Sequence, residues 1–210
     1  YVNRNVDEDD SVESYTGKIF ESAMASLDQV HHSLDMSAIN RAVDLLTQAK
    51  KIAFFGLGSS AAVAHDAMNK FFRFNVPVIY SDDIVLQRMS CMNCNDDDVV
   101  VIISHTGRTK SLVELAQLAR ENDAMVIAIT SPGTPLSRES TLAITLDVPE
   151  DTDIYMPMVS RLAQLTVIDV LATGFTLRRG AKFRDNLKRV KEALKESRFD
   201  KELSLHSNDQ

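Results

Sequence analysis

The sequence has little cysteine, no long apolar run and no excess of positive charge. Two cysteines in 210 residues cannot form a disulfide framework, which fits a reducing, cytoplasmic compartment. No stretch reaches the roughly eighteen apolar residues of a membrane span, and the polar, acidic start is unlike a signal peptide. Since the chain does not begin with Met, we expect it to be a fragment of a longer polypeptide.

The charge balance argues against a nucleic-acid surface. The 23 Lys and Arg residues are outnumbered by 30 Asp and Glu residues, which gives a net charge of −7, and a DNA-binding surface needs concentrated positive charge. Residues 178–202 hold ten basic and five acidic residues, so the rest of the chain carries −12. We interpret this tail as a solvated helix, because its acids are interleaved with its bases at helical spacing. Its narrow apolar stripe is expected to pack against a partner subunit: Phe183, Leu187, Val190 and Leu194.

Apolar spacing predicts helices at the two ends of the chain and an alternating pattern between them. Residues 11–34 and 37–49 have helical spacing, with Ser37 as the N-cap of the second segment. Short Val- and Ile-rich runs then alternate with helical segments, which indicates βαβ crossovers and a parallel sheet. The predicted strands are 52–55, 76–80, 99–103, 125–130 and 142–146, and the predicted helices are 59–74, 83–91, 109–121 and 157–177.

The expected fold is therefore an α/β three-layer α-β-α sandwich. Its five-stranded parallel sheet should have the flavodoxin-like order 2-1-3-4-5, with additional N- and C-terminal helices. We expect an N-terminal segment and helix over 1–36, a ligand-binding domain over 37–177, and a basic helix and tail over 178–210.

Two of the predicted strands end in loops rich in glycine and hydroxyl groups. The first strand runs through Gly58, Ser59 and Ser60 into a helix, and the third runs through residues 104–109, Ser-His-Thr-Gly-Arg-Thr. Glycine lets the backbone approach a ligand closely, and the start of a helix favours an anion. The first and third strands are neighbours at the switch point of the expected sheet, so both loops should open on one crevice. The pair predicts a phosphate-binding site.

These loops resemble those of the sugar isomerase (SIS) domain family. The second loop fits that family's S-x-[S/T]-G-x-T signature, and residues 56–60 fit its first glycine-serine loop. The likeness extends from about Ala42 to Leu177. The segments FFGLGSSAAVAHDA, ISHTGRTK and MVSRLAQLTVIDVL are similar to the effector-binding half of the RpiR family of bacterial transcriptional regulators.

The resemblance implies a sensor rather than an enzyme. It implies a dimeric SIS phosphosugar-binding domain of a regulator, such as a repressor, of carbohydrate metabolism, which needs no cofactor or metal. The expected effector is a phosphorylated sugar or sugar acid such as 2-keto-3-deoxy-6-phosphogluconate. DNA binding would belong to an N-terminal helix-turn-helix domain, which this sequence lacks before Tyr1.

Carried over residue by residue, the resemblance assigns phosphate binding to the two loops. The residues are Gly58, Ser59, Ser60, Ser104, His105, Thr106, Gly107 and Thr109. Arg108 and Lys110 are candidates for the ligand's second anionic group, because a guanidinium suits a carboxylate. Ser160 and Arg161, at the start of the last predicted helix, are candidates for the rim of the site.

A phosphosugar aldose–ketose isomerase is the main alternative. Such a reaction requires a base within hydrogen-bond reach of the substrate. The sequence offers these acid or base groups: His65, Asp66, His105, Glu139 and Asp153.

A dinucleotide site is a second alternative. Gly56, Gly58 and Ala61 fit a loose dinucleotide fingerprint, and Asp82 or Asp83 stands where a ribose-binding acid would be. A dehydrogenase would not need the second hydroxyl-rich loop, so we do not favour this reading.

Cys91 and Cys94 form a C-x-x-C pair. A structural zinc site normally takes four ligands, and the chain offers neither a second cysteine pair nor a spaced histidine pair. We therefore interpret both as ordinary buried or half-buried thiols.

Overall fold

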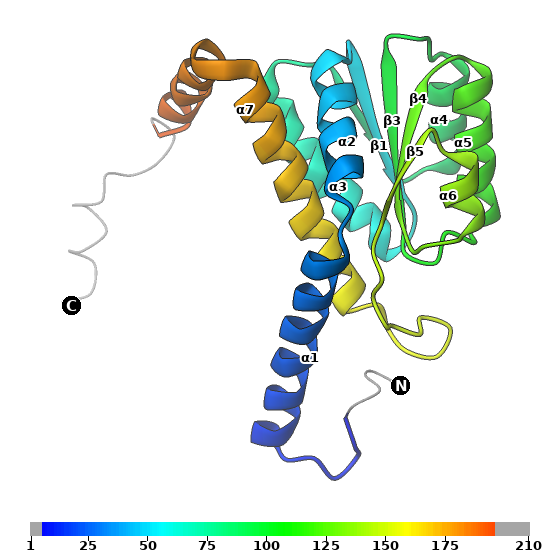
Figure 1. Cartoon of the computed structure of the whole chain (residues 1–210), viewed down its shortest axis with the longest axis vertical. Helices are drawn as coiled ribbons and strands as arrows, with labels where there is room; N and C mark the ends of the chain where they lie inside the picture. The colour runs from blue at the N-terminus through cyan, green and yellow to red at the C-terminus, as the bar shows by residue number, and fades with distance from the viewer. Residues whose placement is uncertain (1–5, 196–210) are drawn as a thin grey trace, which may run out of the picture.

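A five-stranded parallel sheet forms the middle layer of the protein (Figure 1). The structure is a computed structural model, and it describes residues 6–195. The strands are β1 (Lys51–Gly56), β2 (Val78–Ser81), β3 (Asp98–Ser104), β4 (Met125–Thr130) and β5 (Leu142–Thr145). Their order is β2-β1-β3-β4-β5, and every neighbouring pair is parallel. The predicted fold class and strand order are confirmed.

Helices cover both faces of the sheet. One face carries α2 (Met36–Gln48), α3 (Ser59–Phe71) with the 3₁₀ turn η1 (Phe72–Phe74), and α7 (Val159–Lys195), against which α1 (Val12–Ser33) packs. The other face carries α4 (Ile84–Met92), α5 (Lys110–Glu121) and α6 (Pro135–Glu139). Each face of the sheet has its own hydrophobic core, and successive residues of a strand point into opposite cores. Phe54 therefore packs in the core of the first face and Phe55 in that of the second. No helix of the described residues combines the length and apolarity needed to cross a membrane.

The structure corrects some predicted boundaries. Asp35, not Ser37, is the N-cap of α2, because its carboxylate accepts the N–H of Ser37 at 2.8 Å. β2 begins at Val78 rather than Val76, after Pro77, which has no N–H to donate. The five-residue α6 was not predicted, since one turn is too short to show a period.

The first half of α1 leaves the globular body, as Figure 1 shows. Buried residues occur in α1 only at Ser26 and Val30. Val12 and Phe20, which belong to the predicted apolar stripe, are 68% and 65% exposed, and Met24 is 60% exposed. We call residues 6–25 the arm; the core is covered only by the second half of the helix.

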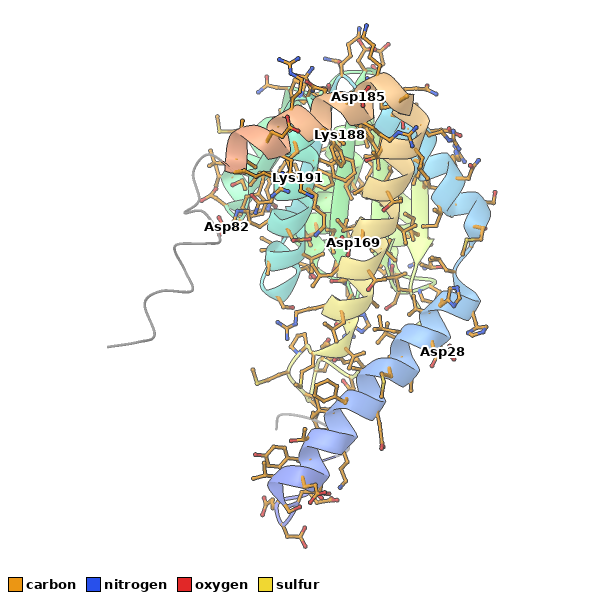
Figure 2. All side chains as sticks on the ribbon, turned by 90° about the vertical axis from the view of Figure 1, so that its left-hand side faces the viewer. Asp28, Asp82, Asp169, Asp185, Lys188 and Lys191 are labelled. Carbon is orange, nitrogen blue, oxygen red and sulfur yellow. The ribbon has the colours of Figure 1, made fainter. Side chains whose placement is uncertain are left out.

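The last helix changes direction at Gly180, where φ is +77° and ψ is −168°. Residues 159–179 form its proximal part, and residues 181–195 form a distal part that crosses the upper end of the molecule (Figure 2). Phe183 and Leu187 of the distal part pack against the core of the same chain, the Phe183 ring lying 5.9 Å from that of Phe175. The prediction that this apolar stripe packs on a partner subunit is therefore wrong for these two residues.

α7 approaches α2 closely at a glycine. A Cβ at Gly174 would lie 2.6 Å from a methyl group of Val43. Beside this contact, Arg178 forms an ion pair with Asp44 and donates to the Asn40 side chain at 2.6 Å. The contact joins the last helix to α2 on the same face of the sheet.

Two Gly→Ala substitutions should have opposite effects on stability. Gly174→Ala should lower the free energy of unfolding by about 1–2 kcal/mol, because overpacking at the stiff Val43 side chain outweighs the gain in helix propensity. Gly17→Ala should raise it by about 0.5–1 kcal/mol, because Gly17 is also helical but a Cβ there meets nothing within 4 Å. Urea unfolding of both variants measures the difference, and equal effects would contradict the packing argument.

Candidate functional site

The two glycine- and hydroxyl-rich loops lie side by side at the carboxyl edge of the sheet. β1 and β3 pair in register from Lys51 opposite Asp98 to Gly56 opposite Ile103, so the strands end together. α3 and α5 begin just beyond them, at Ser59 and Lys110. The positive ends of two helix dipoles are thus placed on one edge of the sheet.

The first loop brings the start of α3 against the end of β1. A Cβ at Gly56 would lie only 2.6 Å from the backbone oxygen of Ser60, so only glycine permits this approach. Gly58 is the N-cap of α3, with φ +57°, and no side chain of the described residues caps the helix there. Ser60 is buried, at 7% exposure. The first N–H groups of α3 therefore remain suited to an anion.

The second loop is ordered by its own hydroxyl groups. Ser104 Oγ accepts the N–H of Gly107 at 3.2 Å, and Thr106 Oγ1 accepts that of Arg108 at 3.4 Å. Each hydroxyl keeps its own proton to donate. Thr109 is the N-cap of α5, but its side chain makes no capping hydrogen bond.

Position 107 requires glycine for two reasons, its backbone conformation and the lack of room for a side chain. Its φ is +56°, which favours glycine, and a Cβ would overlap the hydroxyls of Thr130 and Thr134. These two threonines also lie 3.3 Å apart, oxygen to oxygen. The second loop is therefore packed on the end of β4 and the start of α6.

Glu150 ties the second loop to the start of α7. Its Oε1 accepts the N–H groups of Met158 and Val159 at 2.7 and 2.8 Å, and its Oε2 accepts that of Ser160 at 3.1 Å. The backbone oxygen of Glu150 accepts a hydrogen bond from His105 Nε2 at 3.2 Å. Burial raises the pKa of Glu150, but the hydroxyl of Ser160 and the three N–H groups outweigh it, and the pKa is lowered. Glu150 thus places Ser160 and His105 in one network.

The candidates for a second anionic group occupy different surroundings. Arg108 Nη2 donates to both carboxylate oxygens of Asp153, at 2.9 and 2.7 Å, across the second loop. The side chain of Lys110 is 92% exposed, and its ammonium lies 3.9 Å from Glu114. Arg161 Nε is buried and has no hydrogen-bond partner among the described residues. Arg108 is therefore held beside the loops, whereas Lys110 stands in solvent.

Comparison with known proteins identifies the family. Residues 45–174 match the SIS domain. The chain is 91% identical over 209 residues to the HTH-type transcriptional regulator HexR of Escherichia coli (strain K12), a match that covers 100% of this chain and 72% of that protein. It is 56% identical over 199 residues to the HexR regulator of Pseudomonas aeruginosa, covering 95% and 70%. The chain belongs to the HexR family of SIS-domain transcriptional regulators.

A solved structure agrees with this assignment at the level of the fold. The Vibrio vulnificus NanR protein, described in complex with ManNAc-6P, superimposes on this HexR-family chain with a TM-score of 0.81. The sequence identity is 23%, and the match covers 90% of this chain and 72% of that one. The SIS fold is therefore shared by the two proteins.

The regulator names of the HexR relatives favour a sensor over the isomerase alternative. The side chains considered for acid–base chemistry also have other contacts. His105 contacts Glu150 through one ring nitrogen and lies 3.5 Å from Ser131 Oγ through the other. His65 is exposed and stacks on Tyr80 at 4.9 Å, and Asp66 pairs with Lys70.

Two further alternatives lose support in the HexR-family structure. Asp83 caps α4 by accepting the N–H groups of Val85 and Leu86 at 2.8 and 2.9 Å, so this acid has a structural partner. Cys91 and Cys94 are free thiols, as predicted. Burial, followed by the neighbouring Cys94, raises the pKa of Cys91 to about 12, which makes a reactive thiolate unfavourable.

Glu150, Thr130 and Thr134 were not predicted to belong to this region. A local capping acid stands three residues after the N-cap, whereas Glu150 precedes Ser160 by ten positions along an irregular loop. The two threonines reach Gly107 only through the pairing of β3 with β4. None of the three carries a local sequence signal for its contacts.

Replacing Glu150 should make stability less dependent on pH. Glu150→Gln should lower the free energy of unfolding by about 1 kcal/mol near pH 7, because it removes the charge from the start of α7. The folded pKa of Glu150 lies below its usual 4.5. Its contribution is therefore present above about pH 4.5 and is lost as pH falls through the folded pKa.

Urea unfolding of parent and variant between about pH 3 and pH 7 measures this effect. The difference in free energy of unfolding between parent and variant should be largest near pH 7 and should shrink toward pH 3. Glu121→Gln, at the exposed end of α5, is the control and should change little at either pH. A constant difference across the range would show that the charge of Glu150 is not what stabilises α7.

Proposed function

We propose that this chain is the effector-binding domain of its regulator and that it binds a phosphorylated sugar acid such as 2-keto-3-deoxy-6-phosphogluconate. The proposal rests on two hydroxyl-bearing loops that flank the switch point of the sheet in a HexR-family chain. NanR, which shares the fold, is described in complex with ManNAc-6P, a phosphorylated sugar derivative. The role is binding without catalysis, in the cytoplasm.

The phosphate is bound by neutral donors from both loops. The hydroxyls of Ser59 and Ser60 donate from the first loop, and those of Ser104, Thr106 and Thr109 from the second. His105 keeps the second loop in place through Glu150. Gly58 and Gly107 let the backbone approach, and the starts of α3 and α5 add positive helix-dipole ends. A dianion can be held in this way without a lysine at the phosphate.

The carboxylate of the sugar acid binds Arg108. In the structure this guanidinium holds Asp153, an exposed acid that a ligand carboxylate can replace at little cost. The exchange releases the acidic loop that also contains Glu150. Ser160 and Arg161, at the start of α7, complete the rim of the site, and Lys110 contributes only long-range charge.

Effector binding acts on the rest of the regulator through α7. Glu150 connects the second loop to the start of that helix, so an effector that repositions the loop favours one arrangement of α7. We propose that the protein works as a homodimer and that this arrangement is passed to its DNA-binding part. The net charge of −7 supports placing the DNA contact outside this chain.

Removing hydroxyls from both loops should weaken phosphate binding. Ser60→Ala and Ser104→Ala should each reduce affinity for 2-keto-3-deoxy-6-phosphogluconate by about 10–100-fold, because each removes a hydrogen bond to a charged group. Isothermal titration calorimetry of the single and double variants measures the loss.

Ser90→Ala is the matched control for these variants. Ser90 lies near the end of α4, and its hydroxyl has no hydrogen-bond partner in the described part of the chain. It should bind like the parent. Unchanged affinity in the Ser60→Ala, Ser104→Ala double variant would refute the site.

Arg108 and Asp153 should affect sugar acids and neutral phosphosugars differently. Arg108→Gln should weaken binding of 6-phosphogluconate by about 10-fold or more and leave glucose 6-phosphate nearly unchanged. Asp153→Asn should tighten 6-phosphogluconate binding by up to about fivefold, because it removes a weak, solvent-screened competitor for the guanidinium. Equal effects on the two ligands, measured by calorimetry, would exclude a carboxylate contact at Arg108.

A further inference from the structure

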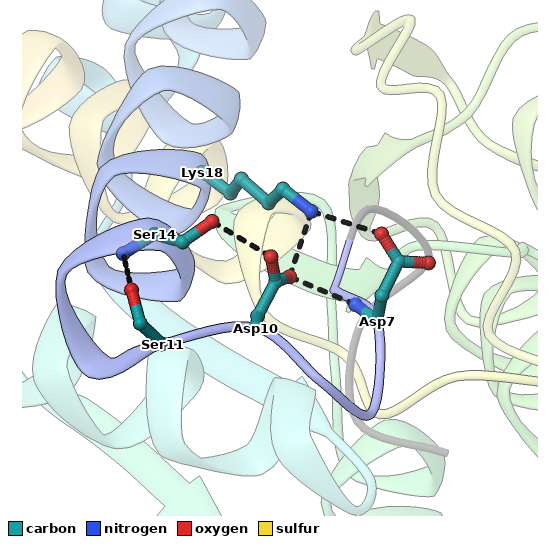
Figure 3. Close-up of polar contacts among 5 residues, drawn as sticks. All are labelled: Asp7, Asp10, Ser11, Ser14 and Lys18. Carbon is teal, nitrogen blue, oxygen red and sulfur yellow. Dashed lines mark hydrogen bonds and ion pairs between the residues drawn. The ribbon is translucent and has the colours of Figure 1, made fainter.

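The arm is an ordered, largely helical segment that contributes no buried residue to the core. Its first turn is held by a polar network in which Lys18 Nζ contacts Asp7 at 3.0 Å and Asp10 at 2.7 Å (Figure 3). Ser14 donates to Asp10 at 2.7 Å, and Ser11 Oγ accepts the N–H of Ser14 at 3.1 Å. The hydrogen bonds from Lys18 and then Ser14 lower the pKa of Asp10 to about 2, so this carboxylate stays charged.

This ordered helix presents large apolar side chains to solvent. Val12, Tyr15, Phe20 and Met24 are 68%, 40%, 65% and 60% exposed. A short isolated helix is marginal in water, and clustered exposed apolar residues mark a binding surface. The arm therefore has the features of a segment that packs against another surface.

The arm is strongly acidic. It carries Lys18 against these acids: Asp7, Glu8, Asp9, Asp10, Glu13 and Glu21. The surface that covers it should accordingly be rich in cations.

The distal part of α7 is the basic segment of matching size. Its cations are Lys182, Arg184, Lys188, Arg189, Lys191 and Lys195, against Asp185 and Glu192. The helical part of the arm, residues 12–25, and the distal part, residues 181–195, are each about 21–22 Å long at 1.5 Å per residue. The helical part of the arm and the distal part are therefore matched in length, and the whole arm, at −5, is opposite in net charge to the distal part, at +4.

The two segments stand at opposite ends of one face. Figure 2 shows the distal part, with Lys188 and Lys191, above the proximal part of α7, and α1 extending below it. They cannot meet within one copy. A second copy placed against this face and turned by 180° about an axis that lies in the plane of the face, perpendicular to the line from the distal part to the arm, brings the distal part of each copy to the arm of the other.

The proximal part of α7 between them is suited to contact. Leu162, Val170 and Leu177 are 41%, 38% and 63% exposed along its outer side. Thr166 and Thr173 donate their hydroxyls to the carbonyls of the preceding turn, at 2.8 and 2.7 Å. With these hydroxyls satisfied inside the helix, the outer side can be covered without losing their hydrogen bonds.

We propose that two copies associate through this face, with the arm of each packed against the distal part of α7 of the other. The contact is isologous and closes on itself, so each dimer makes it twice. This inference rests on the homodimer proposed above and specifies its surface. It places α7, whose first turn is held by Glu150, between the proposed effector site and the partner.

The exposed face of α4 is the rival surface. Val85, Leu86, Met89 and Met92 are 54–60% exposed there. The one cation of that helix, Arg88, already pairs with Glu114 of the same chain at 3.3 Å. Because this face offers no charge complement to the arm, we favour α7.

A charge exchange tests the pairing on the full chain. One variant, Lys182→Glu with Lys188→Glu and Lys191→Glu, changes the net charge of the distal part from +4 to −2. The other, Glu8→Lys with Glu13→Lys and Glu21→Lys, changes that of the arm from −5 to +1. Each alone places like charges at both contacts and should weaken dimerisation by about tenfold or more. An equimolar mixture should recover the parent's dimer affinity, because the mixed dimer has opposite charges at both contacts.

Sedimentation velocity across micromolar concentrations measures the dimer fraction, and circular dichroism checks folding. The control, Arg88→Glu with Arg120→Glu on α4 and α5, should dimerise like the parent. If the parent stays near 23.4 kDa, both the homodimer and this surface are wrong. If the parent dimerises but the two exchange variants do so equally well, or their mixture shows no recovery, the homodimer stands and the surface is wrong. Dissociation by the control alone would assign the interface to α4.

Discussion

The parallel pairing of β1 with β3 is the constraint on which the candidate site depends. Because the crossovers from these two neighbouring strands lead to opposite halves of the sheet, the loops that follow the strands flank the switch point at the carboxyl edge. Neither loop would make a site alone. The first supplies a helix start brought close by Gly56, and the second supplies hydroxyls already ordered by their own backbone.

The sheet and the two loops could be predicted because their signals are local. A buried parallel strand is a continuous apolar run, and a glycine beside hydroxyls at its end is visible in a few residues. The choice of Asp35 over Ser37 as the α2 cap could not be made in this way, since both are good capping residues and the backbone decides between them. The partners of Glu150 and Asp153 could not be predicted for a different reason. They depend on how a long irregular loop returns across the carboxyl edge of the sheet.

The ends of the chain show where apolar periodicity misleads. The pattern of α1 is helical throughout, but a stripe does not say what covers it, and only Leu27, Val30 and Leu34 reach the core. In the tail the opposite happens, because Phe183 joins the aromatic cluster of Phe74 and Phe175 within its own chain. Spacing predicts which residues share a face, whereas the partner of that face depends on where the helix lies.

Gly180 makes the direction of the distal part of α7 depend on a single backbone torsion. With φ at +77°, an L residue with a side chain there would be strained, and the helix would tend to run on straight. A change at this one position would therefore re-aim a basic helix without altering the ligand loops. In the proposed dimer, such a change would alter how the subunits are arranged and leave the proposed effector site intact, so that recognition and assembly would vary independently at Gly180.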